Sequence, residues 1–144
     1  MSEVTTNETH PPRSIGRSIL AVFAGFVTVV ILSLGTDMVL HAAGIFPAIG
    51  QPLSDARLLL LATVYRTVYS VVGSYIAARL APSQAMKHAL ALGAVGLVLS
   101  TVGAVVTWNK GPAFGPHWYP VALIVLAMPG AWLGGALYRE NRSR

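Results

Sequence analysis

The 144-residue sequence contains no cysteine. Without a thiol, the chain cannot form a disulfide, bind zinc or an iron–sulfur cluster through thiolates, or use a cysteine nucleophile. The sequence also lacks a Walker loop, a G-x-G-x-x-G fingerprint and a G-x-S-x-G nucleophile elbow. The chemistry that these motifs support is therefore not expected in this chain.

Charged residues are scarce as well. They make up 10% of the sequence, against about a quarter in a typical soluble domain. Only five residues are acidic, which argues against a two-carboxylate or metal-assisted hydrolase, and we expect that the protein is not an enzyme. Hydrophobic residues account for 54% of the chain and the mean hydropathy is +0.63, values that exclude a water-soluble domain.

Long uncharged segments explain this composition. Residues 18–36, 89–109 and 118–138 contain no charged residue and no histidine, and each is close to the roughly 20 residues that span a hydrocarbon core. Clusters of glycine and proline interrupt the apolar pattern between the segments. The sequence therefore predicts an all-α, polytopic four-transmembrane-helix bundle, residues 18–138, with helices at about 18–43, 57–80, 86–108 and 118–138.

The ends of the chain are polar. Residues 1–17 predict a disordered N-terminal tail, and residues 139–144 a basic C-terminal tail. Seven of the ten lysines and arginines fall on the side of the predicted bundle that carries both tails. The positive-inside rule then predicts a multi-pass protein of the inner (plasma) membrane with both termini cytoplasmic. We interpret the net charge of +5 as basic residues at the helix ends that orient the chain in the membrane and attract the lipid bilayer. We expect no nucleic-acid partner.

A faint internal repeat joins the second and fourth predicted helices. Residues 73–80 align with residues 130–137, small residue with small and aromatic with aromatic. One interpretation is a duplication that produced two parallel helical hairpins, an arrangement found in transporters. The alternative is that small residues and an interfacial aromatic are common at any helix end, and the sequence leaves both open.

Small residues recur at steps of three and four on the predicted helices. Because lipid is as apolar as leucine, membrane helices associate where small side chains let their backbones approach. We expect the third and fourth helices to pack tightly, with no wide aqueous pore, and a homo-oligomer or another membrane protein to be bound through the same faces. The glycines predicted to make helix contacts are Gly73, Gly93, Gly96, Gly103, Gly130 and Gly134.

Three ionisable residues lie inside the predicted spans: Asp37, His41 and Arg66. Such residues are costly in a bilayer and face the bundle interior, where they find partners. Counted from their helix ends at 1.5 Å per residue, Asp37 and Arg66 both lie about 9 to 14 Å from the same membrane face. This matching depth on consecutive antiparallel helices predicts an ion pair between Asp37 and Arg66.

Other polar side chains surround this predicted pair. His41 lies one helical turn from Asp37 on the same face, while Tyr65 and Tyr69 flank Arg66. The five residues predict an intramembrane polar cluster. A structural clasp between the first two helices is the favoured interpretation, and a proton or anion site is the alternative.

A metal site is a weaker hypothesis. Asp37 and His41 have the spacing of two ligands on one helix face, and His117 lies on a loop that could bring a third ligand. No His-rich or H-E-x-x-H pattern supports the site, so neither a metal nor another cofactor is expected.

Three classes of function remain after these observations. The favoured one is an integral membrane assembly or accessory protein with the Asp37–Arg66 clasp. The first alternative is a small ion- or proton-coupled transporter or channel subunit that uses Asp37 and Arg66. The second alternative is a membrane-embedded metal- or haem-binding protein that uses His41 and His117.

Overall fold

The computed structural model of the chain describes residues 14–144, and this part is all-helical. Four long helices are joined by loops, and a short 3-10 helix precedes the last of them. All four long helices are long and apolar enough to cross a membrane, which confirms the predicted all-α bundle of a multi-pass membrane protein. The elements are α1 (Ile15–Ala42), α2 (Ala56–Leu80), α3 (Ala85–Thr107), η1 (Pro112–Phe114) and α4 (Trp118–Arg142).

The helices are longer at their polar ends than predicted. The start of α1 at Ile15 makes the last residues of the predicted N-terminal tail helical, while residues 1–13 of that tail lie outside the described part. The end of α4 at Arg142 extends this helix into the predicted C-terminal tail. There, Asn141 Nδ2 donates to the hydroxyl of Tyr75 at 3.2 Å, and the Tyr138 ring packs edge-on against Tyr75. These contacts with α2 give the polar end of α4 a surface to pack on.

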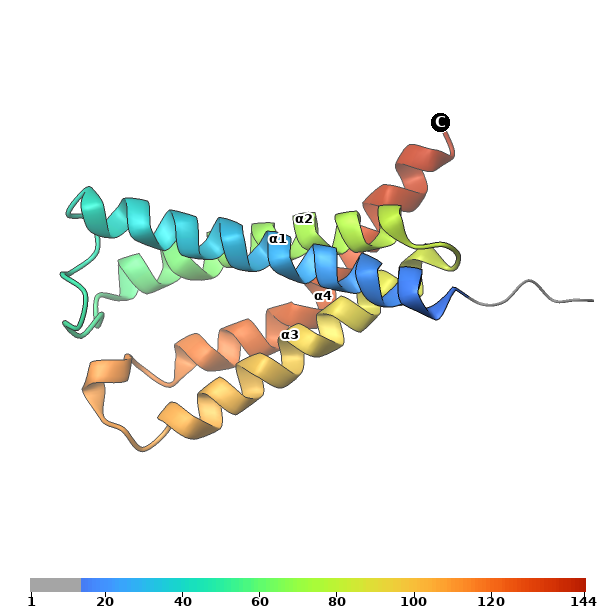
Figure 1. Cartoon of the computed structure of the whole chain (residues 1–144). Coiled ribbons are helices and arrows are strands. Elements are labelled where there is room, and N and C mark those ends of the chain that lie inside the picture. The colour runs from blue at the N-terminus through green and yellow to red at the C-terminus, as the bar shows by residue number, and fades with distance from the viewer. Residues whose placement is uncertain (1–13) are drawn as a thin grey trace, which may run out of the picture.

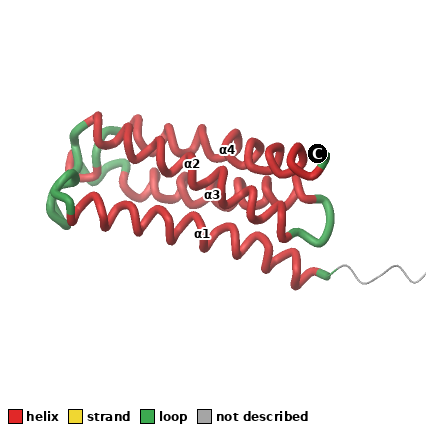
Figure 2. Tube along the Cα trace, turned by 90° about the horizontal axis from the view of Figure 1, so that it is seen from above, coloured by secondary structure: helices red, strands yellow, loops and turns green. Residues whose placement is uncertain are grey.

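The helices form two hairpins, α1–α2 and α3–α4 (Figure 1). Ser14, the α2–α3 loop and the C-terminus lie at one end of the bundle, which we name the terminal end. The loops 43–55 and 108–117 lie at the other, the two-loop end. The hairpins meet toward the terminal end and diverge toward the two-loop end (Figure 1), and the view from above shows all four helices running along a common direction (Figure 2). Helix α2 packs on the other three helices, whereas α1 makes little contact with α3. The internal duplication stays a prediction.

Glycines bring the α1 and α2 backbones together in the terminal half. A Cβ added to Gly25 would lie 2.5 Å from the carbonyl oxygen of Gly73, so the two backbones touch at this crossing. A Cβ on Gly73 would in turn overlap with Val29 and with the Gly25 backbone. Gly73 is thus confirmed as a packing residue, and Gly25 is a packing residue that the sequence pattern did not single out.

Two further predicted glycines are confirmed on α3 and α4. A Cβ on Gly93 would overlap with the side chain of Ala131, which shows close approach of α3 and α4. A Cβ on Gly134 would overlap with the Val71 carbonyl oxygen and lie 2.8 Å from Ser74 Cβ, which shows close approach of α4 and α2. Such contacts are the means by which membrane helices associate without a hydrophobic driving force.

The remaining predicted glycines differ from these. Gly130 is buried, and a Cβ there would make an ordinary contact of 3.6 Å with Ser70 Oγ. In the described part of the chain, Gly96 and Gly103 have no atom within 4 Å of an added Cβ, so the prediction that they make helix contacts within the bundle is wrong. Both lie beyond Gly93 on α3, in the direction of the two-loop end, where the hairpins diverge (Figure 1).

Candidate functional site

Asp37 on α1 and Arg66 on α2 form the predicted ion pair. Arg66 Nη2 lies 2.6 Å from Asp37 Oδ2, and the two side chains are 36% and 20% exposed in the isolated chain. In a helix, each Cα–Cβ bond tilts toward the N-terminus. Since α1 runs toward the two-loop end and α2 runs away from it, Asp37 and Arg66 lean toward each other. The antiparallel hairpin therefore produces the pairing that the residue count predicted.

Tyr65 completes the bonding of the carboxylate. Its hydroxyl donates to Asp37 Oδ1, while Arg66 donates to Oδ2. Both carboxylate oxygens are therefore engaged by adjacent residues of α2. Cζ of Arg66 lies 6.0 Å from the centroid of the Tyr65 ring, so the same aromatic ring also borders the cation. The predicted membership of Tyr65 in the polar cluster is confirmed.

Tyr69 belongs to a second polar link between the same helices. Its hydroxyl lies 2.7 Å from Thr36 Oγ1, and its ring centroid lies 5.7 Å from that of Tyr65. The pairing of Tyr69 with Thr36, rather than with the ion pair, was not anticipated. One feature of the sequence indicates this pairing: Thr36 is a polar residue that immediately precedes Asp37 on α1. Two polar links thus follow one another along the α1–α2 contact.

His41 is not bonded to the ion pair. Its Nδ1 lies 2.6 Å from the carbonyl oxygen of Pro47, and its ring packs edge-on against Phe46 at a centroid distance of 5.5 Å. Because a carbonyl oxygen only accepts, Nδ1 is the donor in this bond. His41 therefore holds the loop that follows α1, and Phe46 is buried against Ala62 and Tyr65 above the polar cluster. The predicted bonding of His41 within the cluster is corrected accordingly.

The structure does not assemble the three residues of the metal hypothesis. Nε2 of His117 lies 2.9 Å from the Trp108 carbonyl oxygen, and its ring stacks on that of Trp108 at 4.3 Å. His117 therefore belongs to the loop of the other hairpin, and His41 uses its Nδ1 on Pro47. Within residues 14–144, no group of three histidine or carboxylate side chains is placed to hold a metal ion.

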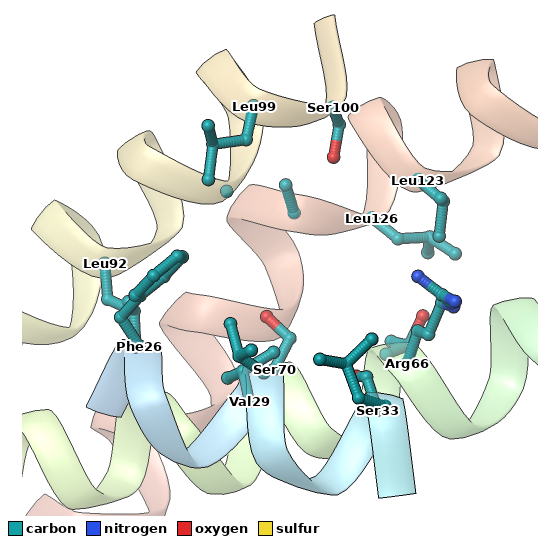
Figure 3. A pocket seen from close by; sticks show the side chains of 15 residues that line it. Phe26, Val29, Ser33, Arg66, Ser70, Leu92, Leu99, Ser100, Leu123 and Leu126 are labelled. Atoms are coloured by element: carbon teal, nitrogen blue, oxygen red, sulfur yellow. The ribbon is translucent and has the colours of Figure 1, made fainter. Parts of the chain in front are cut away.

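Arg66 lies between two hollows. The first opens at the two-loop end, has a volume of about 300 Å³ and is lined by Asp37, His41, Tyr65 and Tyr119 among others. The second is a central cavity of about 310 Å³ to which all four helices contribute (Figure 3). Arg66 lines both. Sequence reasoning missed Tyr119 and the central cavity, since neither follows from a periodic pattern.

The two members of the ion pair differ in their unused hydrogen-bonding capacity. Both oxygens of Asp37 accept from α2. The guanidinium of Arg66 has five N–H groups. In the described part of the chain only its Nη2 has an acceptor, and its Nε is buried without one. Arg66, rather than Asp37, is therefore the group that can still bind an acceptor.

The fold and this site define a multi-pass, four-helix membrane protein with an Asp–Arg–Tyr cluster between its first two helices. Comparison of the chain with models of protein families, with curated proteins and with solved structures finds no match. Its function is therefore inferred from its own residues.

Proposed function

We propose that this chain is an assembly or accessory protein of the inner membrane, in which the Asp37–Arg66 pair is a clasp between α1 and α2. The observation that supports this proposal is that Arg66 and Tyr65 each donate to one oxygen of the Asp37 carboxylate, so both oxygens are held by α2. Bonds from two adjacent α2 residues to one carboxylate set both the depth and the rotation of α1 against α2. A rigid scaffold of this kind suits a protein that presents helix faces to a partner.

The proposed partner surface includes Gly103. This residue is exposed on α3 and has no neighbour within 4 Å of an added Cβ, so another helix can approach its backbone. A second copy of the chain or another membrane protein would supply that helix.

Crosslinking in native membranes tests the accessory role. Wild-type protein should form a discrete crosslinked complex that Gly103→Leu weakens. Gly16→Leu is a matched control, because Gly16 is also exposed and open but lies at the start of α1, at the terminal end of the bundle and away from Gly103. A wild-type protein that remains monomeric and free of partners after crosslinking would contradict the role.

The proposed orientation places the terminal end in the cytoplasm. The distribution of basic residues supports it, because Arg17, Arg79, Lys87 and Arg139 all belong to that end. The lack of native cysteine makes the test direct. A single cysteine at Gly50 should react with an impermeant thiol reagent in intact cells, and one at Ser83 should be protected. Labelling of Ser83→Cys from outside would reverse the orientation.

A small transporter or channel subunit is a second candidate, favoured by one observation. Arg66 lines both the hollow at the two-loop end and the central cavity, so it occupies the position of a gate between them. The double substitution Asp37→Asn with Arg66→Gln separates the two candidates once the variant is shown to fold. An accessory protein should keep its cellular phenotype in this variant, and a transporter that uses the pair should lose it.

A further inference from the structure

The central cavity has the character of a small-molecule site. Its volume of about 310 Å³ falls at the lower end of the range of roughly 300 to 1,000 Å³ typical of such sites. Like those sites, it combines an apolar wall with a few polar groups. Arg66 of α2 directs its guanidinium toward Leu123 and Leu126 of α4, and Ser33 and Ser70 add hydroxyl groups (Figure 3). The apolar wall includes Phe26, Val29, Leu92, Leu99, Leu123 and Leu126.

A second hollow adjoins the central cavity on the side between α1 and α3. It has a volume of about 550 Å³ and is lined by Ile19, Val22 and Val95 among others. Phe26 lines both hollows and so separates them, and α1 makes little contact with α3. A rearrangement of this one side chain would therefore join the cavity to the space between these helices.

Charge decides which polar group such a molecule would carry. The charge of Arg66 is balanced by Asp37 at 2.6 Å, so the pair is neutral as a unit. The two N–H groups of Arg66 Nη1 nevertheless have no acceptor in the described part of the chain and, unlike its Nε, are not buried. An uncharged oxygen acceptor would satisfy these donors, whereas an anion would leave a net negative charge in a low-dielectric region.

We propose that the central cavity binds an uncharged lipophilic molecule that presents a carbonyl-type oxygen to Arg66. The molecule enters from the bilayer between α1 and α3, places its apolar chain against Phe26, Leu92 and Leu99, and accepts a hydrogen bond from the guanidinium. This binding site is independent of the proposed accessory function, because it uses the interior of one bundle rather than its outer face.

Competitive photo-crosslinking tests the site. The protein is placed in nanodiscs of ether-linked phosphatidylcholine, which has no ester carbonyl of its own, with a diazirine derivative of methyl decanoate as the probe. Decane, methyl decanoate and decanoate then compete at equal mole fractions in the bilayer. Methyl decanoate should compete about tenfold better than decane, the effect of one hydrogen bond to a charged group. Decanoate should be the weaker of the two oxygen-bearing competitors.

Two open glycines provide a matched pair of variants. Gly96 of α3 lines the cavity, and an added Cβ there would meet no atom of the described part of the chain within 4 Å, so Gly96→Leu extends a side chain into the cavity. Gly35 of α1 is equally open to an added Cβ but lies outside the cavity lining and away from the proposed partner surface on α3. We expect Gly96→Leu to reduce probe crosslinking at least about tenfold, as exclusion from an apolar pocket requires. Gly35→Leu should leave crosslinking unchanged.

Three results would overturn the proposal. Equal competition by decane and methyl decanoate would show that Arg66 makes no hydrogen bond to the ligand. Tighter competition by decanoate would show that the site prefers an anion. Equal crosslinking of wild type and Gly96→Leu, with both variants folded by circular dichroism, would place the probe outside the cavity. A failure of these tests leaves the Gly103-dependent complex of the accessory role untouched, so the two proposals fail separately.

Discussion

The two halves of the bundle hold their helices together by different means. In the terminal half, glycines let backbones touch, as at Gly25 and Gly73. In the two-loop half, the hairpins diverge and polar side chains tie α1 to α2, through the Asp37–Arg66 pair and through Thr36 and Tyr69. Backbone contact leaves no space between two helices, whereas the divergence of the hairpins leaves space between them. The difference explains why the central cavity and the polar cluster lie where the glycine contacts end.

The largest effect should come from filling a backbone contact. Gly134→Leu would push a side chain into the Val71 carbonyl oxygen and the Tyr75 backbone nitrogen, neither of which can move without bending α2. We expect a loss of more than about 3 kcal/mol in the free energy of unfolding, above the usual range for overpacking because the clashes are with backbone atoms. Denaturant titration in micelles measures it.

The same change at Gly103, an open glycine, is the control for Gly134→Leu. Comparable losses from both substitutions would remove the distinction between packed and open glycines.

Breaking the ion pair should have the next largest effect. Asp37→Asn leaves Arg66 charged and without its partner, and we expect a loss of about 3 kcal/mol, the lower end for a buried pair because these side chains are partly exposed. Arg66→Gln should be milder, since a lone Asp37 can take up a proton and become neutral. The double substitution should recover much of the stability.

Folded yield and unfolding titrations of the two single variants and the double variant give the coupling energy of the pair. Asp55→Asn is a matched control, because Asp55 is an exposed helix cap that forms no ion pair within residues 14–144, and asparagine caps as well as aspartate. Strictly additive losses at Asp37 and Arg66 would mean that the two residues do not act as a clasp.

Tyr65→Phe should have a smaller effect. It removes one hydrogen bond to the Asp37 carboxylate and leaves the aromatic ring in place, for a loss of about 1.5 kcal/mol. Tyr75→Phe serves as the control, because among the described residues the Tyr75 hydroxyl bonds only to the exposed Asn141. If the two substitutions lower the free energy of unfolding equally, the Tyr65 hydroxyl does not stabilise the Asp37 carboxylate.

The smallest effect should come from the open glycines of α3. In the described part of the chain, a Cβ added to Gly96 or Gly103 would meet no atom within 4 Å, so we expect Gly96→Leu and Gly103→Leu to change the free energy of unfolding of the isolated protein by no more than about 0.5 kcal/mol, as for other sites without special contacts. This outcome is the opposite of what the spacing of small residues predicts. A loss near that of Gly134→Leu would show that the hairpins close on each other in the membrane and bury these two positions.

Much of the fold follows from local features of the sequence. The four spans are set by uncharged runs and by glycine and proline between them, and these act within one helix or one loop. The Asp37–Arg66 pair also follows from the sequence. Consecutive spans joined by a loop are antiparallel neighbours, and the number of residues from each helix end to Asp37 or Arg66 gives the depth of that side chain in the membrane. The polar helix ends were less well predicted, since the extension of α4 to Arg142 packs on α2 through Asn141 and Tyr138.

Only the tertiary structure decides which faces meet and where they separate. Gly93 and Gly96 lie on the same helix, three residues apart, yet only Gly93 touches α4. His41 lies one turn from Asp37, yet it bonds to the Pro47 carbonyl because the loop folds back over it. The central cavity exists because the two hairpins diverge. Helical spacing places side chains around one axis, but the angle between two axes is set by the sum of contacts along both helices, and no single segment of sequence contains that information.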